Sequence, residues 1–205
     1  MNRATPPGSW SFFERDSASG VTVLRLRSLD GINQLNGACV AALLHEIGIL
    51  REEWPARPLV FAGNEKYFSA GADLREIRAL AAPAAYEFAL LGQRLMNSIA
   101  HFPAATCAAI EGFCMGGGLD LALSCRFRVA SPNAIFGHRG ASLGLLTGWG
   151  GTQRLPRLIG KGRALQMVCA AEKLTAEQAL EIGLIDQISG DALSVAVRRV
   201  AQLKP

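Results

Sequence analysis

The segment from Ala108 to Asp120, AAIEGFCMGGGLD, constrains the fold of this chain more than any other. The apolar run Ala105–Ile110 predicts a buried strand, and Leu119–Leu123 predicts the start of a helix. Three consecutive glycines, residues 116–118, stand between them. A strand that turns through glycine into a helix leaves backbone N–H groups free, and with the helix dipole they form a site for an oxyanion or a phosphate. Asp120 lies one turn inside this helix, where a carboxylate could act on the polarised group.

The composition is typical of a folded domain with a sizeable core. The chain has 205 residues, of which 50% are hydrophobic and 19% are charged, so we expect one large domain or one domain with a small appendage. No apolar stretch approaches the roughly 18–20 residues that a membrane span needs. The first sixteen residues, MNRATPPGSWSFFERD, lack the continuous apolar region of a secretory signal. These patterns predict a cytoplasmic protein with no membrane partner.

The cysteines and the charge exclude several kinds of site. No CxxC pair occurs among the five cysteines, so we expect reduced thiols buried as small hydrophobic side chains, with no metal site and no disulfide framework. The net charge of +4 comes from scattered cations, and the densest basic run, Arg154–Arg163, has no interleaved aromatic residues. Bases would therefore find no stacking platform there, and we predict a solvated basic face or contacts with a phosphorylated ligand rather than nucleic-acid binding.

The apolar periodicity predicts strands that alternate with helices, and hence an α/β fold with strands covered on both faces. The expected strands are a hairpin of Trp10–Arg15 and Val21–Arg27 around residues 17–20, then Leu59–Ala62, Ala105–Ile110, Phe127–Ala130 paired with Ala134–Phe136, and Leu184–Ile188. The first expected helix follows an N-cap at Asn36, and the second has an apolar inner face from Phe88 to Phe102. Two more helices are expected over Gln153–Ile159 and Gly162–Ala171. Another starts at a capping box of Thr175 and Gln178 and ends at Gly183, and the last spans Asp191–Leu203.

Two loops rich in small residues, Phe68–Asp73 and Phe113–Gly118, each follow a predicted buried strand. The carboxyl ends of strands are where α/β proteins bind their ligands, so one N–H from each loop could converge on a single oxygen. Alternatively, the glycines serve only to let a helix and a strand pack closely. The spacing GxGxxG of dinucleotide-binding folds is absent, and so is the lysine of a phosphate-binding P-loop.

Three ordered motifs, FSAGADL, AAIEGFCMGGGLDLALSCRFRVA and LGLLTGWGGTQRLPRLIGKGRAL, resemble the enoyl-CoA hydratase/isomerase, or crotonase, superfamily. The resemblance covers about Val21 to Ile188 and implies a crotonase-type spiral of ββα turns. It also implies an acyl-coenzyme A substrate, or the corresponding thioester on a carrier protein. Coenzyme A would enter as part of the substrate, and no permanently bound cofactor is expected.

The resemblance also assigns roles to individual residues. The backbone N–H groups of Ala72 and Gly117 would hold the thioester oxygen as its enolate forms, which is a charge that two preorganised donors stabilise by several kcal/mol. The loop from Leu29 to Leu35, the segment from Lys66 through Ala70 to Ala72, and Gly116 would line the coenzyme A groove.

The chain departs from the family pattern at the catalytic carboxylates. Hydratases of this family use two glutamates, and the first of these positions is Asp120 here, whose side chain is one methylene shorter. The second is Gly140, which can neither donate nor accept a proton. Asp120 is therefore the acid–base candidate that remains at the motif positions, and the reaction is hydration or isomerisation if it suffices. Decarboxylation, or acyl-CoA binding without catalysis, are the alternatives.

Several neighbours of these positions have two interpretations. His138 could serve as a general acid or base, or could tie down its loop by hydrogen bonds. Arg139 could hold a substrate carboxylate, or could be solvated or paired with a neighbouring subunit. We expect Asp73 to cap the following helix, and Glu111 to lie near the pocket in a structural role. Phe136 and Trp149 are expected in the core, and Trp149 could also form a wall of the acyl pocket.

Members of the family usually continue well past the position of Ile188 with helices that close the site and pack a trimer. We therefore expect residues 1–190 to form the catalytic spiral and residues 191–205 to form one terminal helix, with most of the usual C-terminal helices absent. A homotrimer or hexamer is expected, weakened by the short C-terminus.

Overall fold

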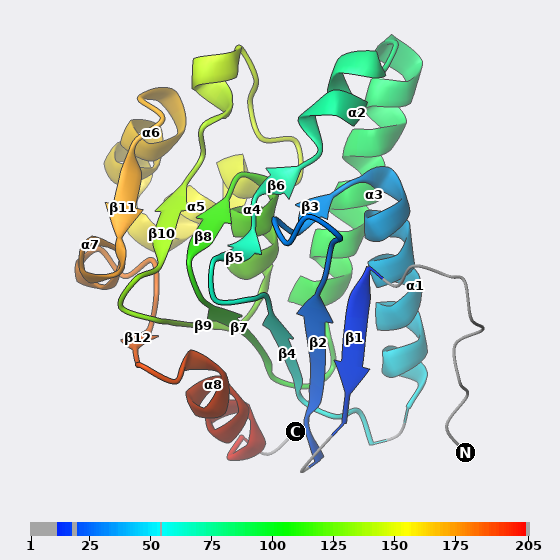
Figure 1. Ribbon diagram of the computed structural model, residues 1–205, viewed down its shortest axis with the longest axis vertical. Coiled ribbons are helices and arrows are strands. Elements are labelled where there is room, and N and C mark those ends of the chain that lie inside the picture. Colours follow the sequence, from blue (N-terminus) through cyan, green and yellow to red (C-terminus); the bar gives the residue numbers. More distant parts are fainter. Residues whose placement is uncertain (1–11, 18–19, 54, 204–205) are drawn as a thin grey trace.

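The computed structural model describes residues 12–17, 20–53 and 55–203, which form three sheets (Figure 1). The six strands of the largest sheet are, in order, β1 (Phe13–Asp16), β2 (Thr22–Leu26), β4 (Leu59–Ala62), β7 (Thr106–Ile110), β9 (Phe127–Ala130) and β12 (Gln187–Ile188). A smaller sheet has the order β11 (Lys173–Thr175), β10 (Ile135–Gly137), β8 (Phe113–Met115) and β5 (Tyr67–Ser69). A two-stranded sheet pairs β3 (Gln34–Leu35) with β6 (Gly71–Ala72).

The helices cover these sheets and connect them. They are α1 (Gly37–Glu52), α2 (Leu74–Ala79), α3 (Ala82–Ala100), α4 (Gly117–Ser124), α5 (Gly151–Ile159), α6 (Lys161–Cys169), α7 (Ala176–Glu181) and α8 (Ala192–Ala201), with a 3₁₀ turn at Gly140–Leu143. None of the helices in the described residues is both long enough and apolar enough to cross a membrane.

The chain repeats one pattern after its N-terminal hairpin: a strand of the largest sheet, a strand of the smaller sheet, and then a helix. β4 and β5 lead through β6 to α2 and α3, β7 and β8 lead to α4, and β9 and β10 lead to α5. Successive turns stack in parallel, because β4 pairs with β7 and β7 with β9, while β5 pairs with β8 and β8 with β10. The expected α/β class and the ββα turns are thereby confirmed.

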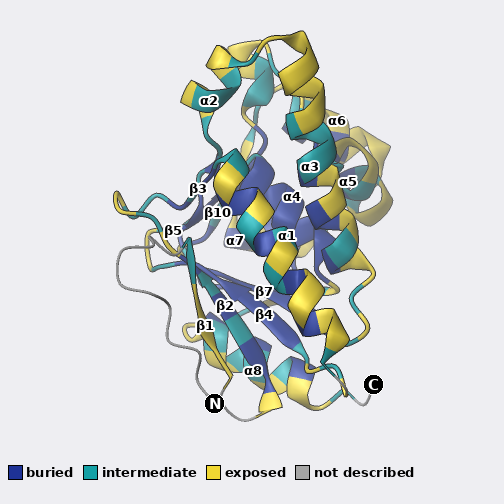
Figure 2. Cartoon of the chain, turned by 90° about the vertical axis from the view of Figure 1, so that its right-hand side faces the viewer, coloured by how far each residue is buried: buried dark blue, intermediate teal, exposed yellow. Residues whose placement is uncertain are grey.

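The central strands are buried on both faces, as their continuous apolar runs predict. All residues of β4 and β7 are buried (Figure 2). One face of these strands presents Val60, Cys107 and Val129 to the apolar side of α8. The other face, which includes Phe61 and Ala108, joins the larger core formed with the remaining helices. β8 and α4 follow β7 directly in the chain, so this fixed platform anchors both of them.

Capping residues set several helix starts where the sequence predicts them. Asn36 accepts a hydrogen bond from the N–H of Cys39 and starts α1, and Asp73 accepts one from Arg75 and starts α2. Thr175 and Gln178 form both bonds of a capping box at α7. The predicted cap at Asp73 is thereby confirmed.

The thiols follow the prediction with one exception. Cys39, Cys107, Cys114 and Cys125 are free and buried, and burial raises the pKa of the Cys39 and Cys107 thiols to about 12. Cys169, near the end of α6, is free but exposed, so the expectation that all five thiols are buried is wrong at this position.

Three of our sequence predictions of strands and loops are wrong. Phe127–Ala130 and Ala134–Phe136 do not pair, because β9 lies in the largest sheet and β10 in the smaller one. The two small-residue loops are not free turns, because they contain the short strands β5, β6 and β8. β5 pairs with β8, and β6 pairs with β3. The last predicted strand is shorter than expected and comprises only Gln187 and Ile188.

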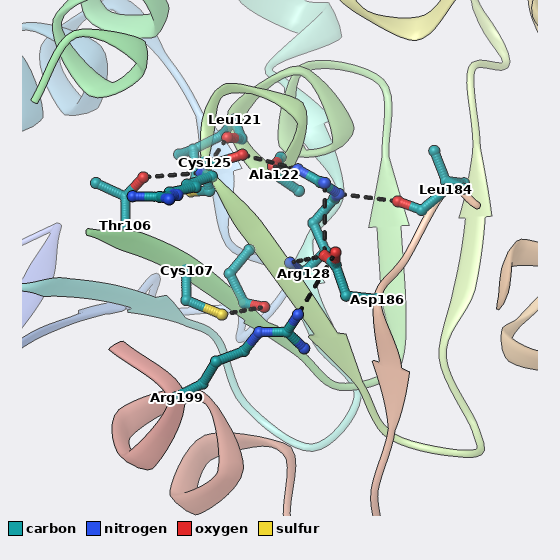
Figure 3. Close-up of polar contacts among 11 residues, drawn as sticks. Thr106, Cys107, Leu121, Ala122, Cys125, Arg128, Leu184, Asp186 and Arg199 are labelled. Carbon is teal, nitrogen blue, oxygen red and sulfur yellow. Dashed lines mark hydrogen bonds and ion pairs between the residues drawn. The ribbon is translucent and has the colours of Figure 1, made fainter. Parts of the chain in front are cut away.

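A buried arginine on β9 fastens the C-terminal end of α4 (Figure 3). The Arg128 guanidinium donates hydrogen bonds to the carbonyl oxygens of Cys125 (2.7 Å) and Leu184 (2.8 Å). It also lies 3.5 Å from the Asp186 carboxylate, which the Arg199 guanidinium of α8 approaches to 3.8 Å. One side chain thus satisfies carbonyls that α4 and the 184–186 segment leave open, and it fixes the helix that carries Asp120.

We expect Arg128→Met to lower the free energy of unfolding by about 3 kcal/mol, because the variant leaves the buried carbonyls of Cys125 and Leu184 without their donor and removes the guanidinium beside Asp186. Urea denaturation measures this loss. Arg198→Met is the matched control, since Arg198 is exposed on α8 and its removal should change stability by less than about 0.5 kcal/mol. Equal effects of the two substitutions would contradict the proposed clamp.

Candidate active site

A cavity of about 600 Å³ lies where β6, the start of α4, the end of β10 and the 140–149 loop meet. Its polar lining includes backbone of Ala72 and Gly117 and the side chains of Asp120 and His138. Its remaining walls are mostly apolar and come from α2, α3 and the loop, with Leu74, Ile77, Phe88, Leu143, Leu146 and Trp149. An apolar cavity with a few convergent polar groups is the usual form of a small-molecule site.

Two backbone segments meet at the floor of this cavity. Gly71 and Gly116 both have positive φ, 91° and 50°, which turns the chain sharply just before Ala72 and Gly117. A Cβ on Gly71 would lie 3.0 Å from the Gly117 nitrogen, and a Cβ on Gly117 would lie 3.3 Å from the Ala72 nitrogen. The start of α4 is therefore in direct contact with β6, and only residues without a side chain permit this approach.

The N–H groups of Ala72 and Gly117 are not consumed by secondary structure. Asp73 donates to the Leu35 carbonyl in the ladder of β3 and β6, so the intervening Ala72 N–H points away from β3. Gly117 is the first residue of α4, where a helical N–H has no acceptor within its own helix. Two neighbouring donors, one of them at a helix N-terminus, can stabilise a developing negative charge on one oxygen.

Trp149 supports this floor and belongs to both the core and the cavity wall. The residue is only 4% exposed, and its ring packs against Gly92 of α3 and Gly117 of α4 so tightly that neither position has room for a Cβ. Its indole nitrogen donates to the Phe88 carbonyl at 3.4 Å. The predicted core position of Trp149 is thereby confirmed, the residue also lines the cavity, and Phe136 lies fully in the core as predicted.

Asp120 lies in the first turn of α4 and is 1% exposed. The Thr147 hydroxyl donates a hydrogen bond to its Oδ2, and the Gly151 N–H at the start of α5 also stabilises the carboxylate. Burial nevertheless dominates and raises the pKa of Asp120 to about 7, since a charge is poorly solvated there. A carboxyl group with such a pKa can both donate and accept a proton near neutral pH.

His138 follows β10 directly and is 3% exposed. Its Nε2 atom lies 3.4 Å from Asp120 Oδ1, and burial lowers the pKa of the imidazole to about 4. Neither atom has a hydrogen-bond partner of acceptable geometry within the described part of the chain. At neutral pH the imidazole is therefore uncharged, and a proton on this pair resides on the carboxyl group.

The glycine at position 151 leaves the space in which this pair lies. A Cβ there would overlap Asp120 Oδ1 and would lie 2.9 Å from His138 Nε2. Thr147 and Gly151 are thus parts of the site that sequence reasoning missed. Neither has a distinctive spacing to Asp120, and the GWGG sequence before α5 only indicated a loop.

Gly140, at the second carboxylate position of the family pattern, begins the 3₁₀ turn. A Cβ there would lie 2.6 Å from the Leu145 carbonyl oxygen, and the Leu145 N–H donates to the Gly140 carbonyl at 2.9 Å. This closed loop has no room for a side chain at position 140. The loss of the carboxylate is therefore built into the backbone of the loop.

The cationic residues at the cavity come from two elements. Arg139 precedes the 3₁₀ turn and is exposed, and no ion pair involves it among the described residues. Lys173 of β11 lies with its Nζ 5.9 Å from the centre of the Phe113 ring. Both line the cavity, so an anionic group of a ligand would find positive charge there.

The residues assigned to a coenzyme A groove do not all meet at this cavity. Ala70, Ala72 and Gly116 line it. Leu29 is 81% exposed, and Leu35 is buried in the larger core. Lys66 lines a separate cavity of about 540 Å³ together with Glu111, so the expectation that Glu111 lies near the active pocket is wrong.

Residues 16–204 match the family described as enoyl-CoA hydratase/isomerase. A human protein named enoyl-CoA hydratase domain-containing protein 2, mitochondrial, is 38% identical over 89% of this chain and 65% of its own. The crotonyl-CoA hydratase of Syntrophomonas wolfei is 35% identical over 88% of this chain and 70% of its own.

Solved structures agree with the sequence matches. An enoyl-CoA hydratase from Bacillus anthracis superposes with a TM-score of 0.87 at 31% sequence identity, over 93% of this chain and 75% of the other. The chain thus spans about two thirds to three quarters of the lengths of these relatives.

Gly151→Ala should lower stability by about 1–3 kcal/mol and reduce turnover, because its methyl group would force Asp120 and His138 apart. Thermal unfolding and activity assays measure the two effects. Gly48→Ala is the matched control: Gly48 is an exposed position inside α1 with open space around it, and alanine should raise stability by about 0.5–1 kcal/mol. A Gly151→Ala variant as stable and active as the wild type would contradict the crowding at this site.

The two perturbed pKa values predict an unusual pH dependence of stability. Between about pH 4 and 6.5 the folded protein holds one proton on Asp120, and the unfolded chain holds one on His138. The effects of the two residues on the slope of stability against pH therefore nearly cancel. In Asp120→Asn only the lowered pKa of His138 remains. Its stabilising contribution is present above pH 6.5 and is lost as the pH falls to about 4, by about 3 kcal/mol.

In His138→Gln the raised pKa of Asp120 remains instead. That contribution is present below the ordinary carboxyl value of 3.8 and is lost as the pH rises through about 7, so the slope has the opposite sign. Urea denaturation of the wild type and both variants between pH 4 and 7.5 measures these slopes. Parallel profiles for all three proteins would contradict the assigned protonation states.

Proposed function

The chain belongs to the enoyl-CoA hydratase/isomerase family, and on that premise we propose that it catalyses the hydration of an enoyl thioester of coenzyme A. The observation that carries the proposal is the contact between β6 and the start of α4. It presents the N–H groups of Ala72 and Gly117 to one cavity, beside the buried carboxyl group of Asp120.

In this proposal the thioester carbonyl oxygen accepts hydrogen bonds from both N–H groups. Conjugate addition of water to the enoyl group turns that oxygen into an enolate, and donors fixed beforehand stabilise the charge more than they stabilise the neutral carbonyl. The dipole of α4 adds to the effect, because Gly117 begins that helix. The charge develops in a site shielded from bulk water, and hydrogen bonds to a charged oxygen are stronger there than in water.

Asp120 is the acid–base group of the proposal. Its pKa of about 7 lies near the pH of a reducing cellular compartment, so both protonation states are populated there. Thr147 fixes the orientation of the carboxyl group through Oδ2, which leaves Oδ1 directed towards His138. An aspartate held in this way can serve where relatives of the family use a glutamate.

The apolar walls suit the acyl chain, and we propose that it lies between α2, α3 and the 143–149 loop. Coenzyme A takes part only as the carrier of the substrate, or is replaced by the same thioester on a carrier protein. Ala70 and Gly116 would contact it at the cavity, and Leu29, Leu35 and Lys66 would line its path outside. Five free thiols support a reducing compartment, for which we propose the cytoplasm, and the assembly we propose is a homotrimer or hexamer.

Decarboxylation of an acyl thioester that carries a carboxylate is the second candidate. Arg139 and Lys173 favour it, because both line the cavity and could hold a carboxylate while Gly140 supplies none. The same oxyanion site would stabilise the enolate that loss of carbon dioxide produces. Mass spectrometry of the products separates the candidates: a gain of one water supports hydration, loss of carbon dioxide supports decarboxylation, and binding without turnover supports an acyl-CoA-binding protein.

Hydration of crotonyl-CoA by Gly117→Pro and Gly117→Ala tests the oxyanion site. Both variants place the same Cβ against Trp149 and lose rate through that clash, and proline suits the first position of a helix, so the two differ in the lost N–H and in the added ring carbons. We expect Gly117→Pro to be at least about 100-fold slower than Gly117→Ala. The loss of absorbance of the conjugated thioester measures the rates. Equal and measurable rates for the two variants would show that the Gly117 N–H does not stabilise the transition state.

A further inference from the structure

Two buried polar atoms at the cavity face each other without a partner. Asp120 Oδ1 and His138 Nε2 are 3.4 Å apart, and neither makes a hydrogen bond of acceptable geometry within the described residues. Buried polar groups are normally hydrogen-bonded, so an unpartnered pair beside a cavity indicates groups that bind something there. The two side chains come from α4 and from the residue that directly follows β10, in successive turns of the spiral.

Two further titratable groups, Arg154 and Cys114, interact electrostatically with Asp120, and neither is suited to exchange a proton with it at neutral pH. Arg154 of α5 lowers the pKa of Asp120 through its charge, but its guanidinium donates to the Trp149 carbonyl at 3.2 Å and to Asn97 Oδ1 at 2.7 Å. Cys114 of β8 is fully buried, and burial raises the pKa of its thiol well above the ordinary value. Thr147 donates to the other carboxylate oxygen.

The geometry also argues against the alternative role of His138. A histidine that ties down its loop would hold a hydrogen bond with a neighbouring backbone group, yet its Nε2 atom has none. Gly151 instead lets the backbone of α5 pack directly against Nε2 and Oδ1 without offering either atom a partner of acceptable geometry, since a Cβ there would overlap the carboxylate. The imidazole nitrogen thus has no structural hydrogen bond to maintain, and Gly140 offers no side chain for proton transfer.

We propose that His138 is the second acid–base residue of this site, and that it holds the attacking water together with Asp120. This assignment rests on the proposed hydration of an enoyl thioester and names the group that replaces the missing carboxylate at Gly140. The water would accept or donate hydrogen bonds at Asp120 Oδ1 and His138 Nε2, which supply two of the two to four polar partners that a bound water needs.

The protons of Asp120 and His138 balance over one reaction cycle. The resting pair holds one proton on Asp120 and none on His138 Nε2. As the water oxygen forms its bond to Cβ of the substrate, Nε2 takes a proton from the water, and the carbon–carbon π electrons move to give the enolate. Asp120 then transfers its proton to Cα, and the product is the 3-hydroxyacyl thioester. The imidazolium returns its proton to the carboxylate across the short gap, which restores the resting pair.

Two assays on the same proteins test the assignment. The first is hydration of crotonyl-CoA, and the second is exchange of the α-protons of butyryl-CoA with deuterated water, which needs the oxyanion site and Asp120 but no second base. We expect His138→Gln to lose at least about 100-fold in hydration and less than about 10-fold in exchange, whereas Asp120→Asn loses both. His101→Gln, at the exposed C-terminal end of α3, is the matched control and should retain both activities.

The outcomes separate this proposal from the proposed function. If the wild type shows neither hydration nor exchange, the proposed function fails. If the wild type hydrates crotonyl-CoA and His138→Gln does so at a similar rate, or loses hydration and exchange equally, the assignment of His138 is overturned. Circular dichroism checks that each variant folds. If His138→Gln does not fold, ¹⁵N NMR of His138 in the wild type at pH 6 decides: a neutral ring with unprotonated Nε2 supports the assignment, and an imidazolium overturns it.

Discussion

The close contact between the Gly71–Ala72 strand and the Gly116–Gly117 helix start is the constraint on which the rest of the site depends. This contact requires two turns with positive φ and two positions without side chains. Trp149 packs against Gly117 and holds the start of the helix in place. The buried strands β4 and β7 supply the fixed platform, and Arg128 holds the far end of α4. Packing far from the cavity therefore determines where the two N–H groups and Asp120 lie.

Much of this arrangement could be predicted from the sequence, because local chemistry decides it. Continuous apolar runs identify β4 and β7, Asn36 and Thr175 mark helix starts through their side-chain caps, and the glycines after β7 mark a turn into α4. The pairing of β9 and β10 was predicted wrongly, because two adjacent apolar segments carry no information on which sheet each one joins. That choice depends on how the turns of the spiral stack.

The environment of the carboxylate could not be predicted for a related reason. Asp120 and His138 are recognisable as candidates, but their distance, their burial and the opposite displacement of their pKa values arise only when α4 and β10 pack together. Thr147 and Gly151 complete the site from a loop without a distinctive pattern. Position 140 is similar: the sequence shows a glycine, and the structure adds that Leu145 excludes any side chain there. The backbone of the loop, and not the residue type alone, therefore excludes a carboxylate at position 140.

The most direct test of the central claim is the infrared difference spectrum of crotonyl-CoA labelled with ¹³C at its carbonyl and bound to the protein. If Ala72 and Gly117 both donate to that oxygen, the carbonyl band shifts to lower frequency on binding than in water, because fixed donors polarise the bond more strongly than mobile solvent. The shift should be smaller in Gly117→Pro than in Gly117→Ala. A carbonyl band that stays at its frequency in water when the thioester is bound would contradict the assignment of the oxyanion site.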